Sequence, residues 1–125
     1  MSAETITARV LLADDHELVR RLLRRALSAH PHLELVGEAA DGSEALALAR
    51  ELAPDVVVLD LAMPELDGLQ VAGELRSHGA RCAILVFSDQ DAEQAALAAG
   101  ADRYLGKAAG FEAAAQAVAD LAVRR

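Results

Sequence analysis

Residues 56–60 read VVVLD, a run of four apolar residues that ends at an aspartate. An unbroken apolar run rich in β-branched side chains is typical of a central parallel strand that is buried on both faces. Two other apolar runs also stop at a polar residue: residues 8–13 (ARVLLA) precede Asp14, and residues 82–87 (CAILVF) precede Ser88. The pattern predicts a sheet whose strands end at polar side chains.

Segments with helical periodicity lie between these runs. In residues 17–29 the apolar positions recur every three or four residues, and four arginines, Arg20, Arg21, Arg24 and Arg25, fall on the opposite face, which predicts a solvated surface. Pro31 is expected to end this helix. The other helices are expected to begin at Asp41 or Ser43, Asp67, Asp91 and Phe111, and to end near residues 52, 77, 100 and 123. Shorter strands are expected over residues 33–36 and 103–105.

This alternation of strands and helices predicts an α/β fold. Strands joined by helical crossovers form a parallel sheet with right-handed connections. Five such units in 125 residues fit the flavodoxin-like, doubly wound sheet of order 2-1-3-4-5 with helices on both faces. The length and the absence of a linker predict one domain over residues 1–125.

Composition limits the class of protein. Apolar residues make up 54% of the chain, enough for a core, but no apolar run reaches the length of a membrane span. The single cysteine excludes an intrachain disulfide, and a net charge of −8 disfavours nucleic-acid binding by this domain. We therefore expect a cytoplasmic domain that binds neither membrane nor nucleic acid.

Five polar residues follow the predicted strands: Asp14 and Asp15 after the first, Asp60 after the third, Ser88 after the fourth, and Lys107, the only lysine, after the fifth. The carboxyl ends of parallel strands open on one edge, and the first and third strands are neighbours in the predicted order. Each residue alone has a simpler interpretation, such as a helix cap or a solvated side chain. Those interpretations do not explain why all five lie at one edge.

Three clustered carboxylates need a counter-charge, because like charges raise one another's pKa. Mg²⁺ suits such a site, since it binds one or two carboxylates, keeps several waters and bridges to phosphate oxygens. A carboxylate can also act as a nucleophile and form an aspartyl-phosphate. Lys107 and the Ser88 hydroxyl would then hold oxygens of the transferred phosphoryl group.

These residues resemble the receiver domain of two-component response regulators. The resemblance rests on the Asp14-Asp15 pair, on Asp60 within LDLAMPELDG (59–68), on Ser88, and on Tyr104 three residues before Lys107. It covers essentially the whole chain. The stretches LLADDHELVRR and VGEAADGSEALALA resemble the NarL/LuxR-type branch, whose members usually carry a helix-turn-helix domain.

The resemblance implies a CheY-like fold and a role for each residue. Asp60 would accept phosphate from a phosphohistidine of a sensor histidine kinase. Asp14, Asp15, Asp60 and the backbone carbonyl of Ala62 would bind Mg²⁺, for which Mn²⁺ could substitute, with Asp14 acting through a metal-bound water. Ser88 and Lys107 would contact the phosphoryl group, and Tyr104 would report the switch. Such a domain turns over no external substrate, can form a homodimer, and controls transcription where a DNA-binding domain follows.

Three features depart from the common receiver pattern. Ala108 follows the lysine where many receivers have a cis-proline, so a trans bond and a reshaped loop are expected. Only twelve positions separate Ser88 from Gly100, which predicts a shortened fourth helix and leaves the usual dimer face in question. Ala62 and Gln90 stand at positions that vary among receivers and influence phosphoryl lifetime.

Three other functions share part of this pattern. A degenerate receiver could act as a phosphorylation-independent interaction module. A haloacid-dehalogenase phosphatase needs a second acid two residues after its nucleophile, where this chain has Ala62, and a flavodoxin needs a first loop that accepts phosphate, which the acidic loop opposes. Cys82 is expected in the core, and His30 and His32 in a loop. His16 follows the acidic pair and could approach the site, but an exposed helix start is favoured.

Overall fold

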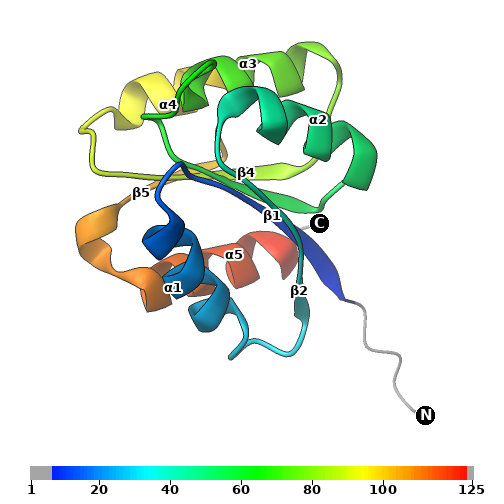
Figure 1. The fold of residues 1–125 in the computed structure, drawn as a ribbon, viewed down its shortest axis with the longest axis vertical. Coiled ribbons are helices and arrows are strands. Elements are labelled where there is room, and N and C mark those ends of the chain that lie inside the picture. Colours follow the sequence, from blue (N-terminus) through cyan, green and yellow to red (C-terminus); the bar gives the residue numbers. More distant parts are fainter. Residues whose placement is uncertain (1–6, 124–125) are drawn as a thin grey trace.

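The structure, a computed structural model, describes residues 7–123, and Figure 1 shows a central sheet between two layers of helices. The elements in chain order are β1 (Ala8–Ala13), α1 (Glu17–Leu27), β2 (Leu33–Ala39), α2 (Gly42–Leu52), β3 (Val56–Leu59), α3 (Gly68–Ser77), β4 (Ala83–Ser88), α4 (Glu93–Ala99), β5 (Arg103–Gly106), a 3-10 turn (Lys107–Ala109) and α5 (Phe111–Val123).

The sheet has the predicted topology. Its five strands are parallel and lie in the order β2-β1-β3-β4-β5. The connections from β1 therefore lead first to one edge of the sheet and then, from β3 onward, to the other. This reversal between β1 and β3 is the point where an open α/β sheet leaves a crevice at its carboxyl edge.

Alternate residues of each strand supply the two halves of the core. In β3, Val56 and Val58 join the apolar cluster under α1 and α5, whereas Val57 and Leu59 join the cluster under α2, α3 and α4. Figure 1 shows the same division, with α1 and α5 on one face of the sheet. All four residues of β3 are buried, which confirms that the VVVL run forms a strand covered on both faces.

Several predicted boundaries are wrong by two or three residues. α1 ends at Leu27 rather than at residue 29, because the chain turns there and the His30 N–H donates to the Leu27 carbonyl at 2.9 Å. β2 continues to Ala39, three residues beyond the predicted end, because it pairs with β1 as far as Ala13. The periodicity of apolar residues reveals neither this turn nor the pairing of β2 with β1.

The fourth helix is shorter than the other α-helices of residues 7–123. α4 begins at Glu93, two residues later than predicted, and has only seven residues, which confirms the shortened fourth helix.

The Lys107–Ala108 bond is trans, as are the other peptide bonds of residues 7–123, and the lysine begins a 3-10 turn. Within the described part of the chain, none of the helices has the length and apolar character needed to cross a bilayer.

Candidate functional site

Pairing between β1 and β3 brings Asp14 and Asp60 together. Ala13 lies opposite Leu59, so the two aspartates leave the sheet side by side, and the Asp60 N–H donates to the Ala13 carbonyl at 2.9 Å. The side chains of Asp14 and Asp60 are both buried. Charged groups rarely occupy such positions without partners, so the surroundings of these carboxylates decide what the site does.

Lys107 is the cationic partner of both aspartates. Gly106 pairs with Ser88 at the end of β4, and the next residue, Lys107, reaches back across the carboxyl edge. Its Nζ lies 2.9 Å from Asp14 Oδ2 and 3.5 Å from Asp60 Oδ2. The predicted meeting of the first, third and fifth strand ends is thus present in atomic contact.

The site perturbs the pKa of both Asp60 and Lys107. Burial raises the pKa of Asp60, and the neighbouring charge of Asp14 raises it further, against the opposing effects of Lys107 and the Ala62 N–H. Burial alone would lower the pKa of Lys107, but the carboxylates of Asp14 and Asp60 outweigh it and the net pKa is raised. One ammonium therefore balances the charge of two buried carboxylates only in part, and the remaining negative charge favours the binding of a further cation.

Asp15 and His16 lie beside Asp14 in the site. The His16 ring Nδ1 lies 3.2 Å from Asp14 Oδ1 and 3.0 Å from Asp15 Oδ1, although the His16 side chain is 64% exposed. Asp14 also accepts a hydrogen bond from the His16 N–H at 2.9 Å. The capping interpretation of Asp14 and Asp15 is wrong, because His16 is the N-cap residue of α1 and no side-chain hydrogen bond caps this helix. One Asp14 oxygen instead accepts from the His16 N–H, and the other faces Lys107.

These residues suit a hard divalent cation. Asp14, Asp15, His16 and Asp60 each offer a ligand atom, and the four atoms lie within 4.8 Å of one another. Carboxylate oxygens are the ligands that Mg²⁺ prefers, and a buried pair with one lysine between them carries an excess of negative charge. The donor set and the charge both fit the predicted metal.

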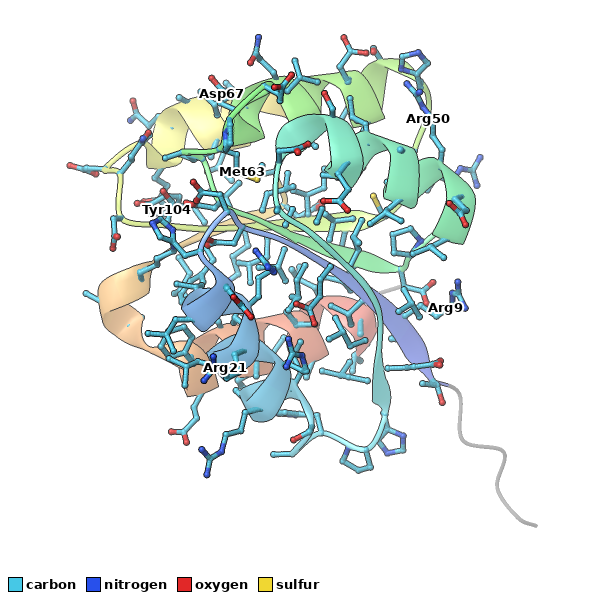
Figure 2. All side chains as sticks on the ribbon, viewed as in Figure 1. Arg9, Arg21, Arg50, Met63, Asp67 and Tyr104 are labelled. Carbon is cyan, nitrogen blue, oxygen red and sulfur yellow. The ribbon has the colours of Figure 1, made fainter. Side chains whose placement is uncertain are left out.

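Ser88 and Tyr104 lie at the same edge and meet through Gln90. The buried Ser88 hydroxyl accepts a hydrogen bond from the Gln90 N–H at 3.1 Å, and the Tyr104 hydroxyl donates to the Gln90 carbonyl. Figure 2 shows Tyr104 at the end of the sheet where Met63 also lies, opposite the end that carries Arg9. The two backbone groups of one residue, Gln90, thus connect the predicted phosphate ligand to the predicted switch residue.

The loop after Asp60 returns tightly to α3. The Gly68 N–H donates to the Leu61 carbonyl at 3.0 Å, and Asp67 caps α3 through a reciprocal pair of hydrogen bonds with Gln70. Ala62 is exposed within this loop, and its predicted role as a carbonyl ligand stays a prediction. The capping box and the close return of Gly68 hold the loop that carries Asp60.

We expect Gly68→Ala to destabilise the protein and to disturb this loop. A Cβ at Gly68 would lie 2.3 Å from the Asp60 carbonyl oxygen and 2.9 Å from the Leu61 Cα, so the backbone must move. Overpacking of this kind costs about 1–3 kcal/mol, and backbone atoms cannot yield as a side chain does. The free energy of unfolding from urea titration measures the loss.

Gly73→Ala is the matched control for this substitution. Gly73 lies in the same helix, and a Cβ there would meet nothing within 4 Å. Alanine in an open helical position should add about 0.5–1 kcal/mol of stability. Equal effects at the two glycines would contradict the close approach of α3 to the Asp60 backbone.

One contributor to the site, Arg20, was missed in the sequence, and an exposed position was favoured for a second, His16. Arg20 belongs to the predicted solvated arginine face, yet its side chain is only 17% exposed and its NH1 donates to the Asp14 carbonyl at 2.6 Å. That prediction was wrong for Arg20. Two features of the sequence could have indicated this role. The helical spacing of Arg20 and Arg24 places both arginines on one face, and an acid, Glu38, lies in a neighbouring strand. His16 is exposed as predicted but also contacts the carboxylates.

Comparison with known proteins agrees with this geometry. The profile of the family described as "Response regulator receiver domain" matches residues 10–119. Among solved structures, the signal receiver domain of the putative response regulator NarL from Mycobacterium tuberculosis superposes with a TM-score of 0.89 and 39% sequence identity, over 95% of this chain and 98% of that one.

Curated relatives point to the same branch. The transcriptional regulatory protein LiaR of Bacillus subtilis is 44% identical over 100 residues, which are 78% of this chain and 47% of LiaR. The nitrate/nitrite response regulator protein NarL of Escherichia coli is 40% identical over 101 residues, with the same coverage of 78% and 47%. This chain thus spans about half the length of these relatives, and the match confirms the predicted likeness to NarL/LuxR-type regulators. It lends no support to a phosphatase or a flavodoxin, and the chain belongs to the response regulator receiver domain family.

Proposed function

We propose that this receiver domain is a phosphoacceptor switch in which Asp60 receives a phosphoryl group. The observation that carries the proposal is the buried Asp14–Lys107–Asp60 arrangement at the carboxyl edge of the sheet. Structural ion pairs are usually balanced, whereas here two buried carboxylates share one ammonium, and the pKa of Asp60 is raised by burial and by Asp14. Such perturbed groups in a crevice are typical of chemically active sites.

Asp14, Asp15 and Asp60 would hold Mg²⁺, with the Ala62 carbonyl as a further ligand. When bound, the ion neutralises charge on the phosphoryl oxygens and on the carboxylates. The site already carries the negative charge that would attract this ion, because the ammonium of Lys107 alone does not balance the charge of the carboxylates. No direct contact between His16 and the ion is required by this proposal.

The chemical step belongs to Asp60. One carboxylate oxygen of Asp60 forms a bond to phosphorus while the phosphorus–nitrogen bond of the donor phosphohistidine breaks, and the imidazole leaves with the electron pair. Lys107 and the Ser88 hydroxyl bind oxygens of the transferred group. The ammonium of Lys107 and the hydrogen-bond donor of Ser88 thus lie next to the negative charge of these oxygens. For this, Lys107 gives up part of its contact with Asp14 and Asp60.

The switch proceeds through Gln90. In the present structure the Ser88 hydroxyl accepts from the Gln90 N–H and the Tyr104 hydroxyl donates to the Gln90 carbonyl. A Ser88 that turns toward the phosphoryl group gives up its hydrogen bond with the Gln90 N–H. Tyr104, which is bound to the carbonyl of the same residue, responds at the surface formed by α4, β5 and α5. The result is a shift of population between two packed states.

The partner we propose is a sensor histidine kinase in the cytoplasm. NarL and LiaR are named as response or transcriptional regulators, and by analogy the output is control of transcription where a DNA-binding domain accompanies this one. A homodimer is a further proposal, which the short α4 makes a matter for measurement. No observation favours the phosphorylation-independent interaction module.

Intact mass spectrometry tests the proposal. The protein is incubated with Mg²⁺ and phosphoramidate, and a gain of one phosphoryl group is expected. The same incubation with a chelator should give no gain, because the carboxylates then stay mutually repelled and the donor's charge is not neutralised. A folded protein that binds Mg²⁺ in a separate titration but gains no phosphoryl group would overturn the proposal.

A further inference from the structure

Glu38 on the edge strand β2 holds two arginines of α1. Glu38 Oε1 accepts from Arg20 Nε at 3.2 Å and from Arg24 NH2 at 3.1 Å, and Oε2 accepts from Arg24 Nε at 2.7 Å. Arg20 is 17% exposed and Arg24 is 49% exposed, so the two cations differ in depth although they share one carboxylate. Hydrogen bonds from both arginines lower the pKa of Glu38, with Arg24 as the largest cause.

Arg20 also reaches the carboxyl edge of the sheet, whereas the Nε and NH2 of Arg24 both donate to Glu38. Its NH1 donates to the backbone carbonyl of Asp14 at 2.6 Å, while the Asp14 N–H donates to the Ala39 carbonyl at 3.0 Å. Glu38 and Ala39 are consecutive residues of β2. The backbone of Asp14 is therefore held at both its N–H and its C=O from the same strand, directly at its N–H and through Arg20 at its C=O.

The carbonyl that Arg20 holds belongs to the peptide that joins Asp14 to Asp15. The plane of this peptide sets the direction in which the Asp15 side chain leaves the backbone. The Asp14 side chain is fixed independently, by the His16 N–H and by Lys107. Asp15 is exposed, and its carboxylate contacts the His16 ring, which is itself 64% exposed. The position of the Asp15 side chain therefore depends on this peptide plane to a greater degree than that of Asp14 does.

We propose that Arg20 is a positioning residue for the divalent-cation site, acting by fixing the Asp14–Asp15 peptide from β2 through Glu38. This inference rests on the proposed function, since it concerns the same site. Outer groups that orient metal ligands commonly change metal affinity by ten- to a hundredfold when they are removed. A guanidinium suits the task because its nitrogens can hold a carboxylate and a carbonyl at once.

Arg20→Gln and Arg24→Gln form a matched pair for the test. Both remove one arginine from Glu38, but only Arg20→Gln releases the Asp14 carbonyl. We expect Arg20→Gln to raise the Mg²⁺ dissociation constant on the order of tenfold in isothermal titration calorimetry. Arg24→Gln should leave it near the wild-type value, even where urea unfolding shows an equal loss of stability.

Arg20→Lys separates charge from geometry. Lysine keeps the positive charge, but its single ammonium does not span Glu38 and the Asp14 carbonyl as a planar fork does. We expect Arg20→Lys to bind Mg²⁺ nearly as weakly as Arg20→Gln. It also serves where Arg20→Gln does not fold. Wild-type affinity in a folded Arg20→Lys would overturn the bridging geometry that the inference requires.

The amide NMR signal of Asp15 in metal-free protein gives a second readout, free of any phosphorylation chemistry. It should move in Arg20→Gln and stay in place in Arg24→Gln. Equal Mg²⁺ affinity and equal Asp15 shifts in the two variants would overturn the inference and leave the phosphoacceptor role standing. A wild-type protein that binds Mg²⁺ normally but gains no phosphoryl group would instead overturn the phosphoacceptor role while the positioning test proceeds.

Discussion

Asp60→Asn is expected to abolish the gain of a phosphoryl group from phosphoramidate in the presence of Mg²⁺. An amide nitrogen or oxygen at this position is not the nucleophile that a carboxylate oxygen is, and the substitution retains the shape of the side chain. Intact mass measures the result. Asp91→Asn, at an exposed aspartate just beyond β4, is the matched control and should gain the group as wild type does. A phosphoryl gain in Asp60→Asn would place the acceptor elsewhere.

The same substitution should stabilise the metal-free protein at neutral pH, by about 1 kcal/mol or more, because it removes a buried charge beside Asp14. The pH dependence gives the sign. The folded-state pKa of Asp60 is raised above its ordinary value of 3.8, so its contribution to stability is complete below that value and is lost as pH rises through the folded-state pKa. The stability gap between Asp60→Asn and wild type should therefore widen over that range. A constant gap in urea unfolding with chelator would contradict the raised pKa.

Lys107→Met is expected to cost the metal-free protein about 3 kcal/mol of unfolding free energy. Its Nζ contacts Asp14 and Asp60, and removal of one partner from a buried ionic group leaves uncompensated charge. Methionine retains the length and apolar stem of lysine, so the loss reports the ammonium. Urea unfolding with a chelator present measures it.

A double substitution isolates the electrostatic origin of that loss. Lys107→Met combined with Asp60→Asn should lose much less than Lys107→Met alone, because one of the two stranded charges is gone. Arg103→Met is the control cation, since Arg103 lies 3.8 Å from Asp120 at the surface and such pairs contribute little. Strictly additive effects in the double variant would show that Lys107 and Asp60 do not interact.

The strand pattern was predictable because burial of a parallel strand shows in its composition. VVVL must lie between two layers of apolar side chains, and the structure places its residues alternately in the two core clusters. The ends of α1 and β2 were not predictable to the residue. The end of α1 depends on a local turn that His30 and Leu27 close, and the end of β2 depends on its pairing with β1, a contact between separate segments.

The site was predictable as a set because a parallel sheet brings its carboxyl ends to one edge. Asp14, Asp60 and Lys107 followed from topology and lie in contact. Residue types and spacing did not reveal that Ser88 and Tyr104 both bind the backbone of Gln90. Such contacts depend on rotamers and loop conformation.

Sequence alone determined the order of the strands along the chain, the polar residue at each strand end and the single lysine, because these follow from periodicity, chain connectivity and residue identity. Tertiary structure decided which of four arginines leaves the solvated face. Arg20 and Arg24 are the same residue type and lie one helical turn apart on the same face of α1. Only Arg20 lies next to the ends of β1 and β2, so it binds the Asp14 carbonyl, while Arg24 remains half exposed. That difference arises from the way α1 lies across the sheet, which no single segment encodes.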